Sequence, residues 1–167
     1  MGILTTVYIF LLIELSFVAY LDLKYKIIKN YWSFINLTIA LILFIAFPHV
    51  YPFSLATFQF SIAFFIVGFL LYLLNIMGGG DSKFLATFFL LIPLENQEDV
   101  FYYLLVITVI IGLSVFTKNI VINFEKIING LKMKNRQMVK ECFGTKFPYA
   151  PVVWLTWIWM GIKTYIL

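Results

Sequence analysis

Two aspartates, Asp22 and Asp81, stand out because each lies where a long apolar stretch meets a polar one. Keeping an ionisable side chain at the edge of an apolar helix costs free energy, so such a residue is a candidate for function. Two carboxyl groups that share one site do not ionise together easily, because the charge of one raises the pKa of the other. One carboxylate can then take a proton from water while the other, protonated, polarises a peptide carbonyl. The pair therefore indicates aspartic proteolysis.

The composition indicates which elements must position these two residues. Of the 167 residues, 63% are hydrophobic and 12% are charged, whereas about a quarter of the residues in soluble domains are charged. A helix needs ~20 apolar residues to cross a bilayer. We expect about six such segments, at residues 3–21, 32–47, 54–77, 84–94, 100–117 and 148–167. The sequence therefore predicts an all-α polytopic membrane protein in which residues 1–167 form a single domain.

The fourth segment, residues 84–94, is too short to cross a bilayer alone, so its helix must begin within the glycines before Asp81 or below the bilayer surface. Gly78, Gly79 and Gly80 permit positive φ and the close approach of another backbone, such as an extended peptide substrate. Irregular backbone at membrane depth is tolerated where it lines a cavity or is covered by protein. The glycines could also simply cap the third helix while Asp81 caps the fourth. This stretch alone leaves both interpretations open.

The basic residues favour one orientation in the membrane. With the N-terminus outside, all Lys and Arg residues except Lys163 face the cytoplasm, in agreement with the positive-inside rule. Both aspartates then lie on the cytoplasmic side, and the connections "PHVYP" and "ENQED" lie outside. In residues 118–147, apolar side chains recur at helical spacing at Ile120, Phe124, Ile127 and Leu131. We expect this segment to lie along the inner membrane surface, where its lysines attract anionic lipid headgroups.

Two further residues invite a functional interpretation. Glu14 precedes Asp22 by eight positions, about 12 Å along a helix, and is too deep to belong to the carboxylate pair. It should be protonated or bind a polar side chain such as Asn36 or Asn75. Cys142 is the only cysteine, which excludes a cysteine-based metal site within the chain. We expect no metal, no cofactor and no nucleic-acid partner.

Three short motifs occur in order, each at the cytoplasmic end of an expected helix: "DLKYKIIKN" (22–30), "GGGDSKFLA" (78–86) and "FPYAP" (147–151). This combination resembles the type IV prepilin peptidases, which are membrane aspartic proteases of the GxGD class, and is most similar to their short form from tight-adherence pilus systems. In the family's first motif, an aspartate is followed by Ile-Pro-Asn; Asp22, Ile28 and Asn30 match, and Lys29 replaces the proline. The other two motifs are matched by Gly78, Gly80, Asp81 and Lys83, and by Pro148, Tyr149, Ala150 and Pro151.

The resemblance implies that Asp22 and Asp81 are the catalytic pair. They would remove the basic leader of a prepilin or pseudopilin at the cytoplasmic face of the inner membrane, just before the apolar helix of the substrate. The longer members of the family carry an added cytoplasmic segment linked to N-methylation, and we find none here, so we expect proteolysis without methylation. Residues expected to bind the substrate or support the site are Gly78, Gly79, Gly80, Lys83, Asn30, Pro148, Tyr149 and Pro151.

Other functions fit some of the same residues. Lys83 could favour the charged form of Asp81 or extend to the membrane interface. A proton-coupled transporter would also keep Glu14, Asp22 and Asp81 inside a helical bundle. A non-catalytic subunit of a secretion machine would not need the aspartates, and a presenilin-like protease would cut within a substrate helix. The third motif and the small size favour a prepilin peptidase.

Overall fold

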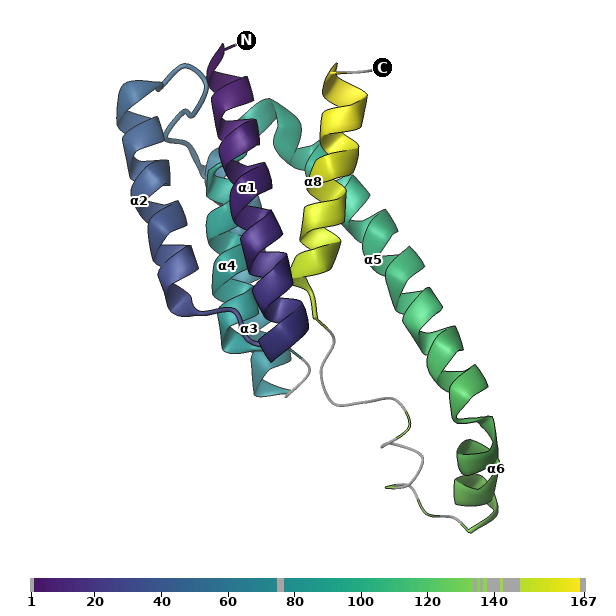
Figure 1. Cartoon of the computed structure of the whole chain (residues 1–167). Coiled ribbons are helices and arrows are strands. Elements are labelled where there is room, and N and C mark those ends of the chain that lie inside the picture. Colours follow the sequence, from purple (N-terminus) through teal and green to yellow (C-terminus); the bar gives the residue numbers. More distant parts are fainter. Residues whose placement is uncertain are drawn as a thin grey trace.

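The computed structural model describes residues 2–74, 77–133, 135, 137, 142 and 148–165. Over these residues the chain is helical and contains no strand, which confirms the predicted all-α fold. The helices are α1 (Gly2–Tyr25), α2 (Asn30–Ala46), α3 (Leu55–Leu73), α4 (Gly79–Leu90), α5 (Leu94–Ile122), α6 (Phe124–Lys132) and α8 (Ala150–Tyr165). The N-terminus, the α2–α3 connection and the C-terminus lie at the same end of the bundle (Figure 1).

The six expected apolar segments correspond to α1 to α5 and α8. Within the described part of the chain, three helices are long and apolar enough to cross a membrane: α1 from Thr5, α3 and α5. Helix α2 is a shorter apolar helix. Helix α4 has only 12 residues, or about 18 Å of length, against the ~30 Å of a hydrocarbon core. It begins at Gly79, so of the two alternatives for the fourth helix, a start within the glycines is correct.

The short helix α4 is the most enclosed part of the bundle. Phe84, Phe88 and Phe89 are fully buried, and α4 packs against both α2 and α3. Because lipid tails are as apolar as these side chains, close packing and small residues drive such contacts within a membrane. Gly68 of α3 illustrates this, since a Cβ at this position would overlap the side chain of Ser82. Neighbouring helices therefore cover α4, which allows it to begin and end at membrane depth.

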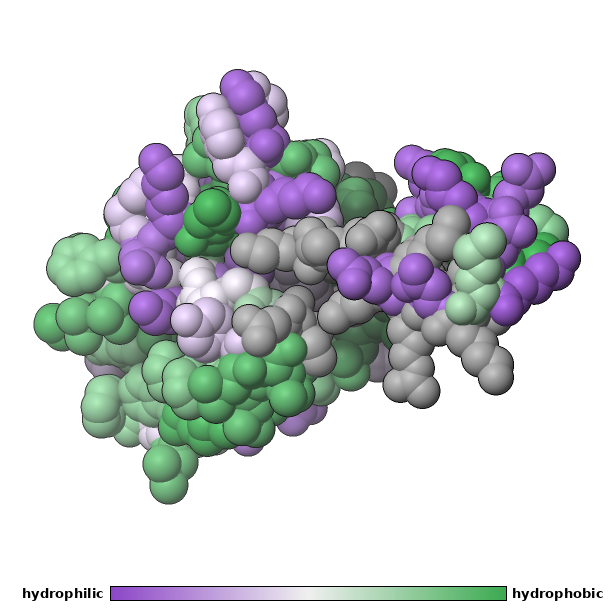
Figure 2. Space-filling view, turned by 90° about the horizontal axis from the view of Figure 1, so that it is seen from below, coloured by the Kyte–Doolittle hydropathy of each residue, from purple (hydrophilic) through white to green (hydrophobic). Residues whose placement is uncertain are grey.

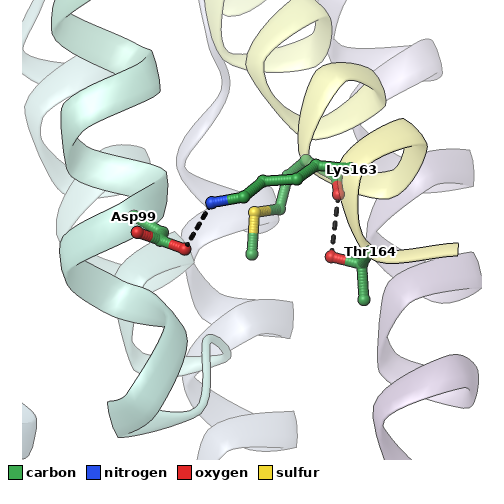
Figure 3. A network of polar contacts seen from close by, with 4 residues as sticks. Asp99, Lys163 and Thr164 are labelled. Carbon is green, nitrogen blue, oxygen red and sulfur yellow. Dashed lines mark hydrogen bonds and ion pairs between the residues drawn. The ribbon is translucent and has the colours of Figure 1, made fainter. Parts of the chain in front are cut away.

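Hydrogen bonds hold the C-terminal end of α4 against the N-terminal end of α5, at the end of the bundle away from the aspartates. Gln97 is fully buried, and its Nε2 lies 3.1 Å from the carbonyl oxygens of Thr57, Phe89 and Ile92. At the same end Lys163 reaches from α8 toward Asp99 of α5, with 3.0 Å between Nζ and Oδ2 (Figure 3). Both side chains of this ion pair are about half exposed, so solvent screens it and it contributes little to stability.

The segment after residue 117 differs from the sequence-based expectation. Helix α5 continues through Ile122, so residues 118–122 extend it and do not begin a separate interfacial helix. A polar residue such as Lys118 does not end a helix, because its helix propensity is high. Asn123 ends α5, and its Nδ2 donates to the Asn119 carbonyl at 3.1 Å. Helix α6 then follows, and much of residues 133–147 lies outside the described part.

The opposite end of the bundle, where α1 and α3 finish, also carries polar residues. Seen from this end, hydrophilic residues gather across part of the face while hydrophobic side chains lie along its edges (Figure 2). The sides of the bundle expose large apolar side chains, such as Phe65 and Phe69 of α3 and Ile110 and Leu113 of α5. This distribution fits a helical membrane protein whose polar end, next to the aspartates, meets water or lipid headgroups.

Candidate active site

Asp22 lies in the last turn of α1 and is 2% exposed. Its Oδ2 accepts a hydrogen bond from the backbone N–H of Ala150 at 3.0 Å. Ala150 is the first residue of α8, so the carboxylate lies at the N-terminal end of that helix. Free N–H groups and the helix dipole favour a negative charge there. The contact joins the first and the third sequence motif.

The chain reverses direction at Lys26, directly after α1 ends at Tyr25. The Lys26 N–H donates to the Asp22 carbonyl oxygen at 2.8 Å, and Lys26 has a φ of 53°. A left-handed residue at this position commonly ends a helix, although it is usually glycine. The strained turn brings Ile28 back into the bundle, where it is buried.

The second motif packs directly against this turn. Gly80 is the second residue of α4, and a Cβ there would overlap the carbonyl oxygen of Ile28. The residue must therefore be glycine for α4 to lie so close to the α1–α2 connection. Together, the contacts between Gly80 and Ile28 and between Asp22 and Ala150 bring all three motifs to one end of the bundle.

Asp81 follows Gly80 and is partly buried. Its Oδ2 accepts a hydrogen bond from the Gly78 N–H at 3.1 Å, so it caps the N-terminus of α4. Gly78 has a φ of −74°, and Gly79 and Gly80 are helical. The glycines therefore do not use the positive φ that they permit, because the chain enters α4 directly. The expected close approach is present, but its partner is the protein's own Ile28 backbone.

The FPYAP motif is described from Pro148 onward. The hydroxyl of Tyr149 lies 3.1 Å from Oγ1 of Thr108 on α5. Pro151 is the second residue of α8, where a missing N–H costs little. Sequence reasoning missed Thr108, since nothing in the apolar run of α5 distinguishes it.

The remaining candidates lie further from these contacts. Asn30 begins α2 and is exposed, and Lys83 is exposed on α4; their roles stay predictions. Glu14 is 3% exposed, and each of its carboxylate oxygens lies 2.9 Å from the amide nitrogen of Asn36, once this amide is oriented to donate. The predicted partner Asn36 is therefore confirmed, whereas Asn75 lies outside the described residues. Over the described residues, no three His, Cys, Asp or Glu side chains are grouped to hold a metal.

Asp22 and Asp81 each lie at a helix N-terminus, and both lie at the same end of a helical membrane protein. The chain belongs to the type IV leader peptidase family, whose sequence model matches residues 9–117. This match spans more than half of the chain and includes Asp22 and Asp81, while the third motif follows it. The predicted family is thereby confirmed. Comparison with curated proteins gives no match, and comparison with solved structures gives none either.

Lys29 stands where the first motif of the prepilin peptidases has a proline, and this difference leads to a first prediction. Lys29 has a φ of −77°, which lies within the range that a proline ring imposes. We expect Lys29→Pro to stabilise the protein by about 0.4–1 kcal/mol, because it restricts the unfolded chain without straining the folded one. Thermal unfolding in detergent measures the effect. Lys26→Pro is the control and should destabilise, since Lys26 has positive φ and its N–H is bonded; a lower Tm for Lys29→Pro would contradict this account.

Proposed function

We propose that this peptidase is an aspartic endopeptidase that removes the basic leader of prepilins or pseudopilins, with Asp22 and Asp81 as its acid-base pair. The observation that carries the proposal is the convergence of the three motifs through the Asp22–Ala150 and Gly80–Ile28 contacts. Family membership supports a leader peptidase. We further propose one peptidase domain that carries out proteolysis without methylation and needs no metal or cofactor.

In the proposed reaction, the ionised carboxylate takes a proton from a water molecule, and the resulting hydroxide attacks the scissile carbonyl carbon. The second, protonated carboxyl group gives its proton to the carbonyl oxygen. In the collapse of the resulting gem-diol, the second carboxylate takes back a proton from one hydroxyl group as the new C=O bond forms. The C–N bond breaks, and the leaving amine takes up the proton of the first carboxyl group, which restores the starting state of both aspartates. Both aspartates lie at helix N-termini, at α8 for Asp22 and α4 for Asp81. This placement lowers the cost of the negative charge that moves between them.

The substrate that fits this site has a leader rich in Lys and Arg, a glycine before the cut and an apolar helix after it. Anionic headgroups attract such a leader by about 1 kcal/mol per basic residue, which would hold the cut site at the membrane surface. A glycine leaves room for the two carboxyl groups. Co-expression with candidate prepilins, read as a mobility shift, tests the proposal. Unprocessed substrate throughout a panel of prepilins with these features would reject it.

The proposed orientation has the N-terminus outside and the aspartates at the cytoplasmic face of the inner membrane. The native Cys142 is expected on the cytoplasmic side and could report the orientation by its reaction with a thiol reagent. It is buried, however, and would react poorly. We therefore suggest Met133→Cys and His49→Cys in a Cys142→Ser background, since Met133 and His49 are both exposed. In intact cells, an impermeant thiol reagent should label position 49 and should label position 133 only after lysis. The reverse pattern would overturn the orientation.

A further inference from the structure

Thr108 makes a contact that crosses from α5 to the start of α8. Its Oγ1 donates to the Leu104 carbonyl oxygen at 2.6 Å and lies 3.1 Å from the hydroxyl of Tyr149. A hydroxyl group has one proton and two lone pairs. Because Thr108 gives its proton to Leu104, Tyr149 must be the donor in the second bond. The direction of this bond is therefore determined by the geometry.

Tyr149 is the residue from which α8 starts. Its carbonyl oxygen accepts from the N–H of Val152 at 3.0 Å, which forms the first turn of the helix. The next residue, Ala150, donates its N–H to Asp22. The Tyr149 side chain is thus anchored to α5 while its main chain sets the position of the amide that holds the candidate catalytic carboxylate.

We infer that Thr108 is a positioning residue for Asp22, acting through the Tyr149 hydroxyl and the first turn of α8. The inference rests on the proposed function, because it assigns the contact a part in catalysis. Asp22 lies on α1, and the amide that donates to it lies on α8. The carboxylate therefore keeps its position only if the start of α8 keeps its position relative to α1. The Thr108–Tyr149 bond ties that start to a third helix. Small errors in the position of a catalytic group lower the rate of reaction much more than they weaken binding.

Kinetics on a peptide with a basic leader and an apolar helix tests the inference. Thr108→Val keeps the shape of the side chain but loses the acceptor, and we expect kcat to fall about tenfold with KM unchanged. Thr108→Ser keeps the hydroxyl and should restore kcat. Tyr149→Phe should match Thr108→Val, and the double variant should be no worse than either, because all three remove the same bond. A wild-type kcat in Thr108→Val, or multiplied losses in the double variant, would overturn the inference.

Ser114→Ala is the matched control. Ser114 lies on the same helix and donates to the Ile110 carbonyl at 2.8 Å on an exposed face, so its loss should leave kcat unchanged. An equal loss of kcat in Ser114→Ala would show a general effect of hydroxyl removal from α5 and would contradict the specific role of Thr108.

Hydrogen exchange of the Ala150 amide gives a readout that does not depend on cleavage. In the full-length protein in detergent, this amide should exchange about tenfold faster in Thr108→Val than in the wild type or in Thr108→Ser. Unchanged exchange would overturn the inference even if the enzyme is active. Faster exchange in a protein that cleaves no prepilin would reject the proposed function and leave the link from Thr108 to α8 supported.

Discussion

Asp22→Asn and Asp81→Asn should each abolish cleavage of a basic-leader substrate, with a loss of kcat on the order of 10⁴-fold. Asparagine keeps the size and the polarity of aspartate, but it neither accepts the proton of water nor cycles through ionisation. Because the two carboxyl groups act as one unit, the double variant should be no worse than either single variant. Cleavage is measured as the mobility shift of a co-expressed prepilin and as turnover of a leader peptide.

The structure indicates that these variants should fold. In Asp22→Asn the remaining side-chain carbonyl can still accept the Ala150 N–H, and in Asp81→Asn it can accept the Gly78 N–H. Protein levels in the membrane should therefore barely change. Substantial cleavage by either single variant would reject the two-carboxylate mechanism.

Two controls separate the catalytic pair from other acids. Asp99→Asn makes the same chemical change at the opposite end of the bundle, where only the exposed ion pair with Lys163 is lost. Glu14→Gln changes a buried acid that binds Asn36 within the bundle. Both should retain most of the activity. A transporter would instead depend on Glu14, and a non-catalytic subunit would leave prepilin processing unaffected by any of these substitutions.

Gly80→Ala should lower cleavage at least about 100-fold and destabilise the protein by about 1–3 kcal/mol. The added methyl group would overlap the backbone carbonyl oxygen of Ile28. A carbonyl oxygen in a tight turn does not rotate away as a flexible side chain does, so α4 or the α1–α2 connection must shift. Asp81 is the next residue on α4, and Ile28 lies six residues after Asp22. The shift would therefore move Asp81 away from Asp22.

Gly79→Ala is the matched control, since it makes the same substitution one residue earlier in the same helix. Among the described residues, the atoms nearest to a Cβ at Gly79 belong to the ring of Tyr72, with the nearest carbon at 3.4 Å, an ordinary van der Waals contact. Alanine is also favoured over glycine within a helix by roughly 0.5–1 kcal/mol. Gly79→Ala should therefore be at least as stable as the wild type, in contrast to Gly80→Ala. Equal activity and equal Tm in the two variants would reject the proposed role of the Gly80–Ile28 contact.

The sequence by itself determined the class of the fold and the identity of the candidate site. Apolar segments long enough for helices are visible along the sequence, because each helix that crosses a bilayer needs ~20 consecutive apolar residues. The two aspartates stand out for the same reason, as a charge beside an apolar run is costly and therefore rare. The Glu14–Asn36 contact was also predictable, since a buried acid needs a polar partner and few are available in these helices.

Local signals were weaker at the boundaries of the elements. The end of α5 was predicted too early, because a lysine within a helix looks like the edge of a membrane span although it does not interrupt the helix. The glycines before Asp81 suggested positive φ, but the three residues enter α4 in ordinary conformations. Lys26, which does have positive φ, gave no such signal, because its conformation is imposed by the turn that follows α1.

Only the tertiary structure decided how the motifs meet. The Asp22–Ala150 hydrogen bond joins residues 128 positions apart, and the Thr108–Tyr149 bond joins residues 41 positions apart. Such contacts depend on the packing of α8 against α1 and α5. Helical periodicity indicates which face of a helix is buried but not which partner covers it. The same limit applies to Gly80, whose lack of a side chain acquires its meaning only when the Ile28 carbonyl is packed against it.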